Sequence, residues 1–225
     1  MKKEIKNNHE NDEIEYKLIL LGDTSVGKTC LFKKITQGIF SDKNVSTVGI
    51  DRKTFKIECD LEIDGKTETK TIIINLTDTA GEERFKSITK SYYKDSDGAV
   101  LLYDITEKKS FIHVKDWIKS IKNSPSHIEN DKYSIFLIGT KIDLIEKGKR
   151  LREVELSEAK SKCEEFGLYW GGECSNKEFT TEKYKEIFKS FVKIIYSKIG
   201  DKDFASQSIV KLDIKPIKKP KVCLC

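Results

Sequence analysis

The chain has 225 residues, of which 35% are charged and 37% apolar, and its formal net charge is +5. This length suits one domain with terminal tails. Basic residues are not interleaved with aromatic ones in a stripe, so no nucleic-acid partner is expected. No apolar run is long enough to cross a membrane, and the N-terminal stretch MKKEIKNNHENDE lacks the apolar segment of a signal peptide. We therefore expect a cytoplasmic protein.

The hydrophobic pattern predicts strands that alternate with helices after an initial hairpin. The predicted elements are a strand over 16–21, a helix ending near 36, a hairpin over 55–76, strands over 99–103 and 134–139, a short apolar strand at 168–170, and helices over 111–121, 155–166 and 181–199. We expect residues 1–14 to be a disordered tail and residues 200–225 to be a flexible one. For residues 15–199 between them, the pattern predicts a three-layer α/β domain whose six-stranded sheet is mostly parallel with one antiparallel edge strand.

Residues 22–29 read GDTSVGKT and match the phosphate-binding pattern G-x-x-x-x-G-K-[ST] between a predicted strand and a predicted helix. Gly22 and Gly27 let the backbone bend so that its N–H groups point at phosphate oxygens. Lys28 is expected to reach the β- and γ-phosphates, and the Thr29 hydroxyl to bind Mg²⁺. On the loop alone, a glycine-rich turn capped by a threonine remains the alternative.

Three more motifs follow predicted strands. Asp78, in the segment DTAG, is a carboxylate that can hold Mg²⁺ through water, and Gly81 can bring its N–H to a γ-phosphate. In the segment TKID, Asp143 can accept both donors of a guanine edge while the stem of Lys141 lies over the base. The segment ECSNK covers 173–177. Four such motifs in order, each at the carboxyl end of a strand, predict a guanine-nucleotide site.

Further segments resemble the Rab group of the Ras superfamily of small GTPases. They are RFKSIT at 84–89, the pair Tyr92-Tyr93, LLYDIT at 101–106 and, resembling the first switch loop, STVGID at 46–51. The resemblance covers about residues 14–199 and the C-terminus. It implies a P-loop GTPase fold that binds GTP or GDP with Mg²⁺.

The resemblance also implies residue roles. Thr47 would bind Mg²⁺ beside Thr29 and Asp78, and the backbone N–H near Asn176 would read the guanine carbonyl. Lys28 and Glu82 would be the catalytic residues. The predicted nucleotide-binding set is Gly22, Asp23, Thr24, Ser25, Val26, Gly27, Lys28, Thr29, Cys30, Thr47, Gly81, Thr140, Lys141, Asp143, Ser175, Asn176 and Lys177.

The six cysteines fall into two groups. Four show no C-x-x-C spacing, so neither a zinc site nor a disulfide framework is expected; these are Cys30, Cys59, Cys163 and Cys174. Cys223 and Cys225 follow four lysines in the last eleven residues. Prenylation of the C-a-a-X type would need a cysteine at position 222, which is Val. The terminal C-x-C resembles the Rab signal for two geranylgeranyl groups, and the alternative is a solvated basic tail with two free thiols.

Several positions depart from the Rab pattern. Glu82 stands where the family has the Gln that orients the attacking water, so we expect slow intrinsic hydrolysis. As a carboxylate it could instead serve as a general base if its pKa were raised. Arg52 and Thr77 replace Phe and Trp, which predicts a more polar effector surface. Thr140 replaces the Asn that ties the base loop to the phosphate loop, and its hydroxyl can make part of that link.

The hairpin is longer than the family pattern by about four residues on each side of Asp64-Gly65, an even addition that keeps the alternating faces in register. We expect an extended two-stranded ribbon that projects beside the switches.

The sequence thus predicts a monomeric, prenylated switch that regulates vesicle-mediated membrane traffic on the cytosolic face of an intracellular or plasma membrane. The implied partners are an exchange factor, a GTPase-activating protein, a dissociation inhibitor or escort protein, and effectors. Two alternatives remain at this stage. One is a non-hydrolysing, lipid-anchored GTP-bound scaffold, and the other is a P-loop kinase or ATPase, against which the Asp143 motif argues.

Overall fold

The structure is a computed structural model that describes residues 13–41, 49–79, 96–123 and 133–200. Several residues with predicted roles lie outside these ranges, so their roles stay predictions: Thr47, Gly81, Glu82, Cys223 and Cys225.

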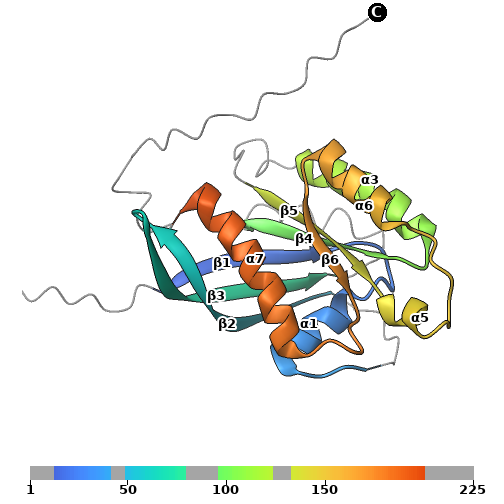
Figure 1. Ribbon diagram of the computed structural model, residues 1–225, viewed down its shortest axis with the longest axis horizontal. Helices are drawn as coiled ribbons and strands as arrows, with labels where there is room; N and C mark the ends of the chain where they lie inside the picture. The colour runs from blue at the N-terminus through green and yellow to red at the C-terminus, as the bar shows by residue number, and fades with distance from the viewer. Residues whose placement is uncertain (1–12, 42–48, 80–95, 124–132, 201–225) are drawn as a thin grey trace, which may run out of the picture.

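A single six-stranded sheet forms the middle layer, in the order β2-β3-β1-β4-β5-β6 (Figure 1). Its strands are β1 (Ile14–Leu21), β2 (Ile50–Ile63), β3 (Lys66–Thr79), β4 (Gly98–Asp104), β5 (Ser134–Thr140) and β6 (Tyr169–Cys174). Only β2, at one edge, pairs antiparallel, and the other neighbouring strands pair in parallel. The predicted mostly parallel sheet with one antiparallel edge strand is confirmed.

Helices cover both faces of this sheet. They are α1 (Lys28–Gln37), α3 (Lys108–Lys122), α5 (Ile142–Glu146), α6 (Leu156–Phe166) and α7 (Thr181–Ile199). The buried side chains of α1 and α7 belong to one core, and those of α3 and α6 to a second core on the other face. Every residue of β4 and of β5 is buried, because both faces of these central strands are covered. Within the described ranges, no helix is long and apolar enough to cross a membrane.

Strand β1 begins inside the segment predicted to be a tail. Ile14 is 3% exposed and pairs with Ile72 of β3, so the predicted tail over 1–14 is one residue too long. The extra strand residues are held by pairing with β3, a contact between distant segments that the local sequence pattern does not carry.

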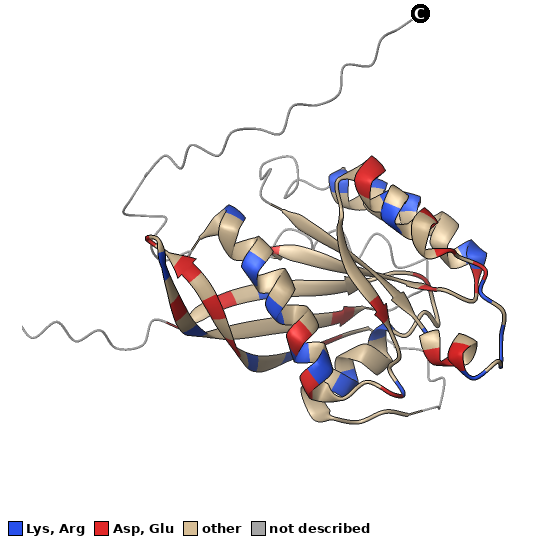
Figure 2. Ribbon diagram, in the orientation of Figure 1, with Lys and Arg blue, Asp and Glu red and all other residues tan. Residues whose placement is uncertain are grey.

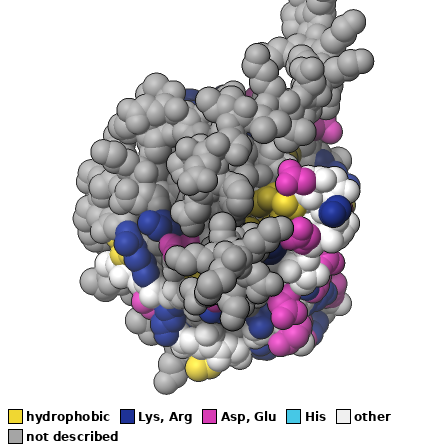
Figure 3. All heavy atoms as spheres, turned by 90° about the vertical axis from the view of Figure 1, so that its left-hand side faces the viewer, with side chains coloured by type: hydrophobic (Ala, Val, Ile, Leu, Met, Phe, Trp, Pro, Cys, Tyr) yellow, Lys and Arg dark blue, Asp and Glu magenta, His cyan; other side chains and the backbone are white. Residues whose placement is uncertain are grey.

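The long hairpin extends away from the switches, so the prediction that it projects beside them was wrong. From Ile50, next to the first switch segment, β2 runs 14 residues to a turn at Asp64-Gly65, which lies roughly 45 Å further along the strand. Figure 1 places this tip at the far left, near the C-terminal end of α7. Figure 2 shows charged residues of both signs along the strands of the hairpin, and Figure 3, which looks onto this end of the molecule, shows such side chains on the described surface.

One face of the hairpin packs on α7. Phe55, Ile57, Cys59 and Leu61 alternate with exposed residues along β2 and join the same core as the helix. The Phe55 ring meets the Phe188 ring edge to face at 5.4 Å between centroids. The added residues therefore enlarge the core, because the long α7 offers them an apolar face that sequence reasoning did not connect to the hairpin.

Replacing Leu61 by Ala tests this arrangement. Leu61 is 2% exposed, and deleting a buried Leu side chain destabilises a domain by about 2–4 kcal/mol. We expect a loss of that size in denaturant unfolding. Glu58→Ala, on the exposed face of the same strand, should change the unfolding free energy by less than about 0.5 kcal/mol. Equal, small effects of both substitutions would show that the hairpin does not pack on α7.

Candidate nucleotide-binding site

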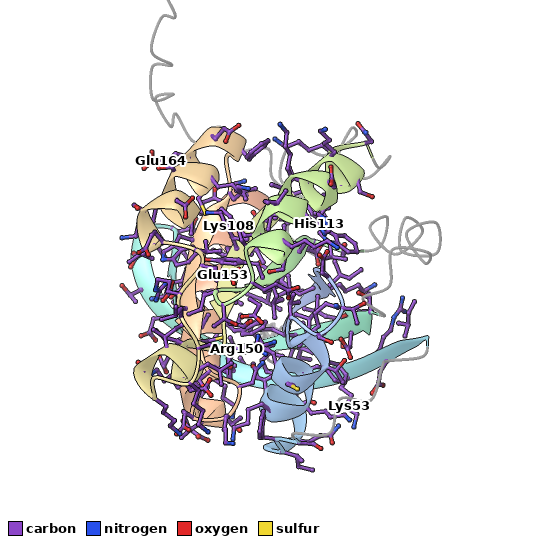
Figure 4. All side chains as sticks on the ribbon, turned by 90° about the vertical axis from the view of Figure 1, so that its right-hand side faces the viewer. Lys53, Lys108, His113, Arg150, Glu153 and Glu164 are labelled. Atoms are coloured by element: carbon purple, nitrogen blue, oxygen red, sulfur yellow. The ribbon has the colours of Figure 1, made fainter. Side chains whose placement is uncertain are left out.

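The predicted motifs meet at one edge of the sheet. They follow β1, β3, β5 and β6, and these four strands all run in the same direction. The carboxyl ends of parallel strands share one edge, where α/β sheets bind ligands. Figure 4 looks onto this edge, with α3 and its His113 above and Lys53 of β2 below.

The loop between β1 and α1 requires its glycines. Gly22 has φ 131° and Gly27 has φ 101°, values that side chains rarely adopt. A Cβ on Gly22 would lie 2.3 Å from the carbonyl oxygen of Leu102, so no larger residue fits there. The Val26 side chain is fully buried, so only its backbone can contribute to a ligand site.

Lys28 folds back over this loop. Its Nζ donates to the carbonyl oxygens of Gly22 at 2.8 Å and of Asp23 at 2.7 Å, and the residue is 5% exposed. Burial lowers the pKa of Lys28 to about 8, although the charges of Asp78 and Asp23 oppose this shift. A cation held in a backbone cradle at the start of a helix is suited to binding an anion.

Asp78 places a buried carboxylate opposite Lys28. It is 1% exposed, and within the described residues neither carboxylate oxygen has a hydrogen-bond partner. Burial raises the pKa of Asp78, while the Thr29 side chain and the Lys28 charge act to lower it. Buried polar atoms in proteins are normally paired. A carboxylate left open beside the Thr29 hydroxyl fits the all-oxygen ligand set that Mg²⁺ prefers.

A threonine next to Asp78 fixes its position. The Thr79 hydroxyl donates to the carbonyl oxygen of Leu20 at 2.7 Å, across the parallel pair of β3 and β1. This bond joins the end of the strand that carries Asp78 to the strand that enters the phosphate loop.

The residues predicted to read the base follow β5. Thr140 is fully buried at the strand end, Lys141 has a left-handed φ of 68°, and Asp143 lies in the first turn of α5, 7% exposed. The ammonium of Lys141 is 2.6 Å from a carboxylate oxygen of the buried Asp104. Sequence reasoning missed both Asp104 and the short helix α5.

The ECSNK segment lies beside the base motif. Thr140 pairs with Cys174 across β5 and β6, and Ser175 is 1% exposed. The Nζ of Lys177 is 5.9 Å from the centroid of the Phe40 ring. Phe40, which sequence reasoning also missed, thus brings an aromatic ring to the end of the site where a planar base is predicted to bind.

Two side chains connect this end of the site to the phosphate loop. The Thr140 Oγ1 is 2.7 Å from the carbonyl oxygen of Val26, so the prediction that its hydroxyl makes part of this link is confirmed. The Asn176 Nδ2 donates to the carbonyl oxygen of Gly27 at 3.0 Å. The first contact was expected from the family pattern, whereas the second was not.

Other predicted residues contribute in less direct ways. The Asp23 carboxylate accepts a hydrogen bond from the Trp117 Nε1 at 2.8 Å and lies 2.5 Å from the Nδ1 of His113. These partners lie on α3, far along the chain, and no local signal in the sequence points to them. The Cys30 thiol is half-buried in the first turn of α1, 3.9 Å from the carbonyl oxygen of Ser41, so its side chain is engaged outside the phosphate loop.

The two substituted aromatic positions are cross-strand neighbours. Arg52 of β2 pairs directly with Thr77 of β3, and Arg52 is exposed while Thr77 is half-buried. Residues opposite each other on an antiparallel pair form one surface. The two polar side chains next to the switch segments are therefore neighbours, and a more polar effector surface stays a prediction.

A glycine-shaped phosphate loop, a buried lysine and an open carboxylate at the carboxyl edge of a parallel sheet define a P-loop nucleoside triphosphate-binding protein. The family model described as "Ras family" matches residues 17–197. Ras-related protein Rab-13 of Mesocricetus auratus is 36% identical over 212 residues, covering 93% of this chain and 95% of the relative. Ras-related protein RAB1BV of Beta vulgaris is 34% identical, covering 89% and 85%.

The GTP-binding protein ypt1 of Schizosaccharomyces pombe is 33% identical over a match that covers 88% of this chain and 89% of the relative. The chain therefore belongs to the Ras family and is a Rab-type small GTPase, an enzyme that hydrolyses GTP to GDP and phosphate. The resemblance found in the sequence is confirmed.

Replacing Asp78 by Asn tests the open carboxylate. A raised folded-state pKa means that the contribution of Asp78 to stability is present in acid and is lost as the pH rises through that value. At pH 7 the ionised group opposes folding of the ligand-free protein. In EDTA and without nucleotide, Asp78→Asn should therefore raise the unfolding free energy by about 1–3 kcal/mol.

The same substitution should remove most of the effect of Mg²⁺ on GDP retention, measured as the release rate with and without the ion. Asp64→Asn, at the exposed hairpin turn, serves as the matched control and should change neither quantity. A loss of stability on Asp78→Asn in EDTA would contradict our description of this carboxylate.

Proposed function

We propose that this GTPase is a membrane-traffic switch that binds GTP or GDP with Mg²⁺ and changes the conformation of its switch segments with the state of the nucleotide. The observation that carries this proposal is the open, buried carboxylate of Asp78 beside Thr29, facing the cradle that holds Lys28. The regulators and effectors known for Rab proteins in general are the expected class of partners.

The phosphate end of the site is built for a triphosphate. Backbone N–H groups of the loop over 22–29 and the N-terminus of α1 supply positive ends of dipoles, and Lys28 supplies a charge. Thr29 and Asp78 would hold Mg²⁺, and the bound ion would neutralise part of the charge on the β- and γ-phosphates. Thr47, contributed by the first switch segment, would complete the ligand set only when the γ-phosphate is present.

The base end supports guanine. Asp143 at the start of α5 would accept hydrogen bonds from the two donors on the guanine edge, and the backbone near Asn176 would donate to the guanine carbonyl. Phe40 and the stem of Lys141 are the flat and apolar groups available to cover the base faces. This use of the Asp143 carboxylate requires two donors on the edge of the base, which argues against an ATP-binding kinase.

Hydrolysis depends on how the attacking water is oriented. A Gln after the DTAG motif both donates and accepts hydrogen bonds, whereas Glu82 only accepts when ionised and adds negative charge near the γ-phosphate. We infer that intrinsic hydrolysis is slow and that an activating protein supplies the missing groups. A scaffold that never hydrolyses GTP is the alternative that Glu82 favours.

Glu82→Gln separates these two functions. We expect single-turnover phosphate release from the GTP-loaded protein to accelerate by about tenfold, the effect of one hydrogen bond to a charged group. Glu58→Gln, an exposed position on the hairpin, should leave the rate unchanged. No phosphate release from the parent protein, even with an activating protein, would contradict the switch and support the scaffold.

The C-terminal segment is expected to hold the protein on membranes. One lipid chain gives marginal, reversible membrane binding, whereas two chains with a basic segment give stable anchoring. Cys223 and Cys225 are the proposed sites for two geranylgeranyl groups, and the lysines before them would meet anionic lipid headgroups. The protein would then cycle between the cytoplasm and the cytosolic face of a membrane.

Serine substitutions test this anchor in cells that carry out prenylation. The double variant Cys223→Ser and Cys225→Ser should move entirely to the soluble fraction, whereas Cys225→Ser alone should bind membranes weakly and reversibly. Ser208→Ala, in the same segment, is the matched control and should fractionate as the parent does. Retention of the double variant on membranes would rule out prenylation as the anchor.

A further inference from the structure

The side chain of Asn176 is held from both sides. Its Nδ2 donates to the carbonyl oxygen of Gly27 at 3.0 Å, and its Oδ1 accepts from the hydroxyl of Tyr184, on α7, at 2.6 Å. Asn176 is 7% exposed and Tyr184 is fully buried. The orientation of the amide follows from its partners, because a backbone carbonyl can only accept and must therefore face the NH₂ group. Both ends of this amide are thus used inside the protein.

Tyr184 is suited to remain a donor to Asn176. Burial is the largest influence on its phenol and raises its pKa far above the neutral range. The hydroxyl therefore keeps its proton and fixes the amide oxygen. Since the amide is planar, fixing its oxygen also aims its NH₂ group at Gly27.

Thr140 makes only part of the link between the two ends of the site. Its hydroxyl lies 2.7 Å from the carbonyl oxygen of Val26 and 2.9 Å from that of Tyr103. A hydroxyl carries one proton, so these two carbonyls compete for a single donor. The NH₂ group of Asn176 adds a separate donor at Gly27, the next residue of the phosphate loop.

The bond to Gly27 acts on the start of α1. Gly27 is the N-cap residue of this helix, and its carbonyl oxygen also accepts the first helical hydrogen bond, from the Leu31 N–H at 2.9 Å. Asn176 therefore occupies the second lone pair of the same oxygen. A Cβ on Gly27 would lie 2.6 Å from the Asn176 Nδ2, so the close approach of the two loops depends on this glycine.

We propose that Asn176, oriented by Tyr184, is a positioning residue that shares with Thr140 the link between the guanine end and the phosphate end of the site, and thereby slows release of the bound nucleotide. The inference rests on the proposed guanine-nucleotide binding. A nucleotide that spans both loops leaves when they separate, and each hydrogen bond between the loops opposes that separation. Because Gly27 keeps its helical bond when Asn176 is replaced, nucleotide release should change more than thermal stability.

The test is the release rate of fluorescent GDP from the full chain in Mg²⁺, with excess unlabelled GDP as competitor. Asn176→Ala should release GDP about tenfold faster, as expected for the loss of one buried hydrogen bond. Asn176→Asp keeps the shape of the side chain and still accepts a hydrogen bond from Tyr184, but it cannot donate to Gly27. This variant should therefore release GDP at least as fast as Asn176→Ala. Tyr184→Phe should also accelerate release.

The double variant Asn176→Ala with Tyr184→Phe distinguishes positioning from a general structural role. If Tyr184 acts through Asn176, the double variant should release GDP no faster than Asn176→Ala alone, whereas independent effects would multiply. Tyr16→Phe is the matched control. It also removes one buried tyrosine hydroxyl, which donates to the carbonyl oxygen of Gly200 at 2.9 Å, but at the opposite end of β1, and it should keep the parent release rate.

Two results would overturn the inference while leaving the proposed function intact. They are an Asn176→Asp protein that releases GDP at the parent rate, and a Tyr16→Phe protein that releases it as fast as Asn176→Ala. Should Asn176→Ala not fold, Asn176→Asp and Tyr184→Phe decide the question alone. A parent protein that holds no guanine nucleotide would refute the proposed function, and this inference with it.

Discussion

The parallel pairing of β1 between β3 and β4 is the constraint on which the rest of the structure depends. Leu21 ends β1 and is immediately followed by the phosphate loop, while Ile19 pairs with Thr77, next to Asp78. This register brings a carboxylate and a cation, 50 residues apart in the chain, close enough for each charge to shift the pKa of the other. If β3 slipped by one residue, Asp78 would point to the other face of the sheet.

The candidate site contains buried charges that the surrounding protein groups do not fully compensate. Lys28 is buried with its pKa lowered, and Asp78 is buried with its pKa raised. By contrast, the buried carboxylate of Asp104 has close partners in Lys141 and in the backbone and hydroxyl of Thr106. Charges left without full compensation at one edge of the sheet are what a site for a charged ligand requires, and natural proteins break the rule of satisfied burial mainly at functional sites.

The long hairpin shows how tertiary packing can reverse an expectation. Its alternating pattern correctly predicted one buried and one exposed face, but not the element that covers the buried one. The 19-residue α7 runs along this face, so the extra residues become core on one side of the sheet. The same helix carries Tyr184, which donates a hydrogen bond to Asn176 in the candidate nucleotide site. Helix α7 therefore contacts both the hairpin and the loops at the carboxyl ends of the parallel strands.

The sequence by itself determined the order of the strands and of the longer helices, the phosphate loop and the base motifs, because these depend on local spacing. The bounds of α7 matched the prediction, since its apolar residues recur at helical intervals and Thr180 caps its start. Local signals also located Asp78 and Asp143 at strand ends.

Only the tertiary structure decided which distant groups meet. Asn176 with Gly27, Asp23 with Trp117 and Lys141 with Asp104 are pairs that no pattern along the chain predicts. Their meeting depends on the order and register of the strands. Parallel pairing brings loops from remote segments to one edge of the sheet, and the hydrogen bonds between those loops are then set by geometry in three dimensions.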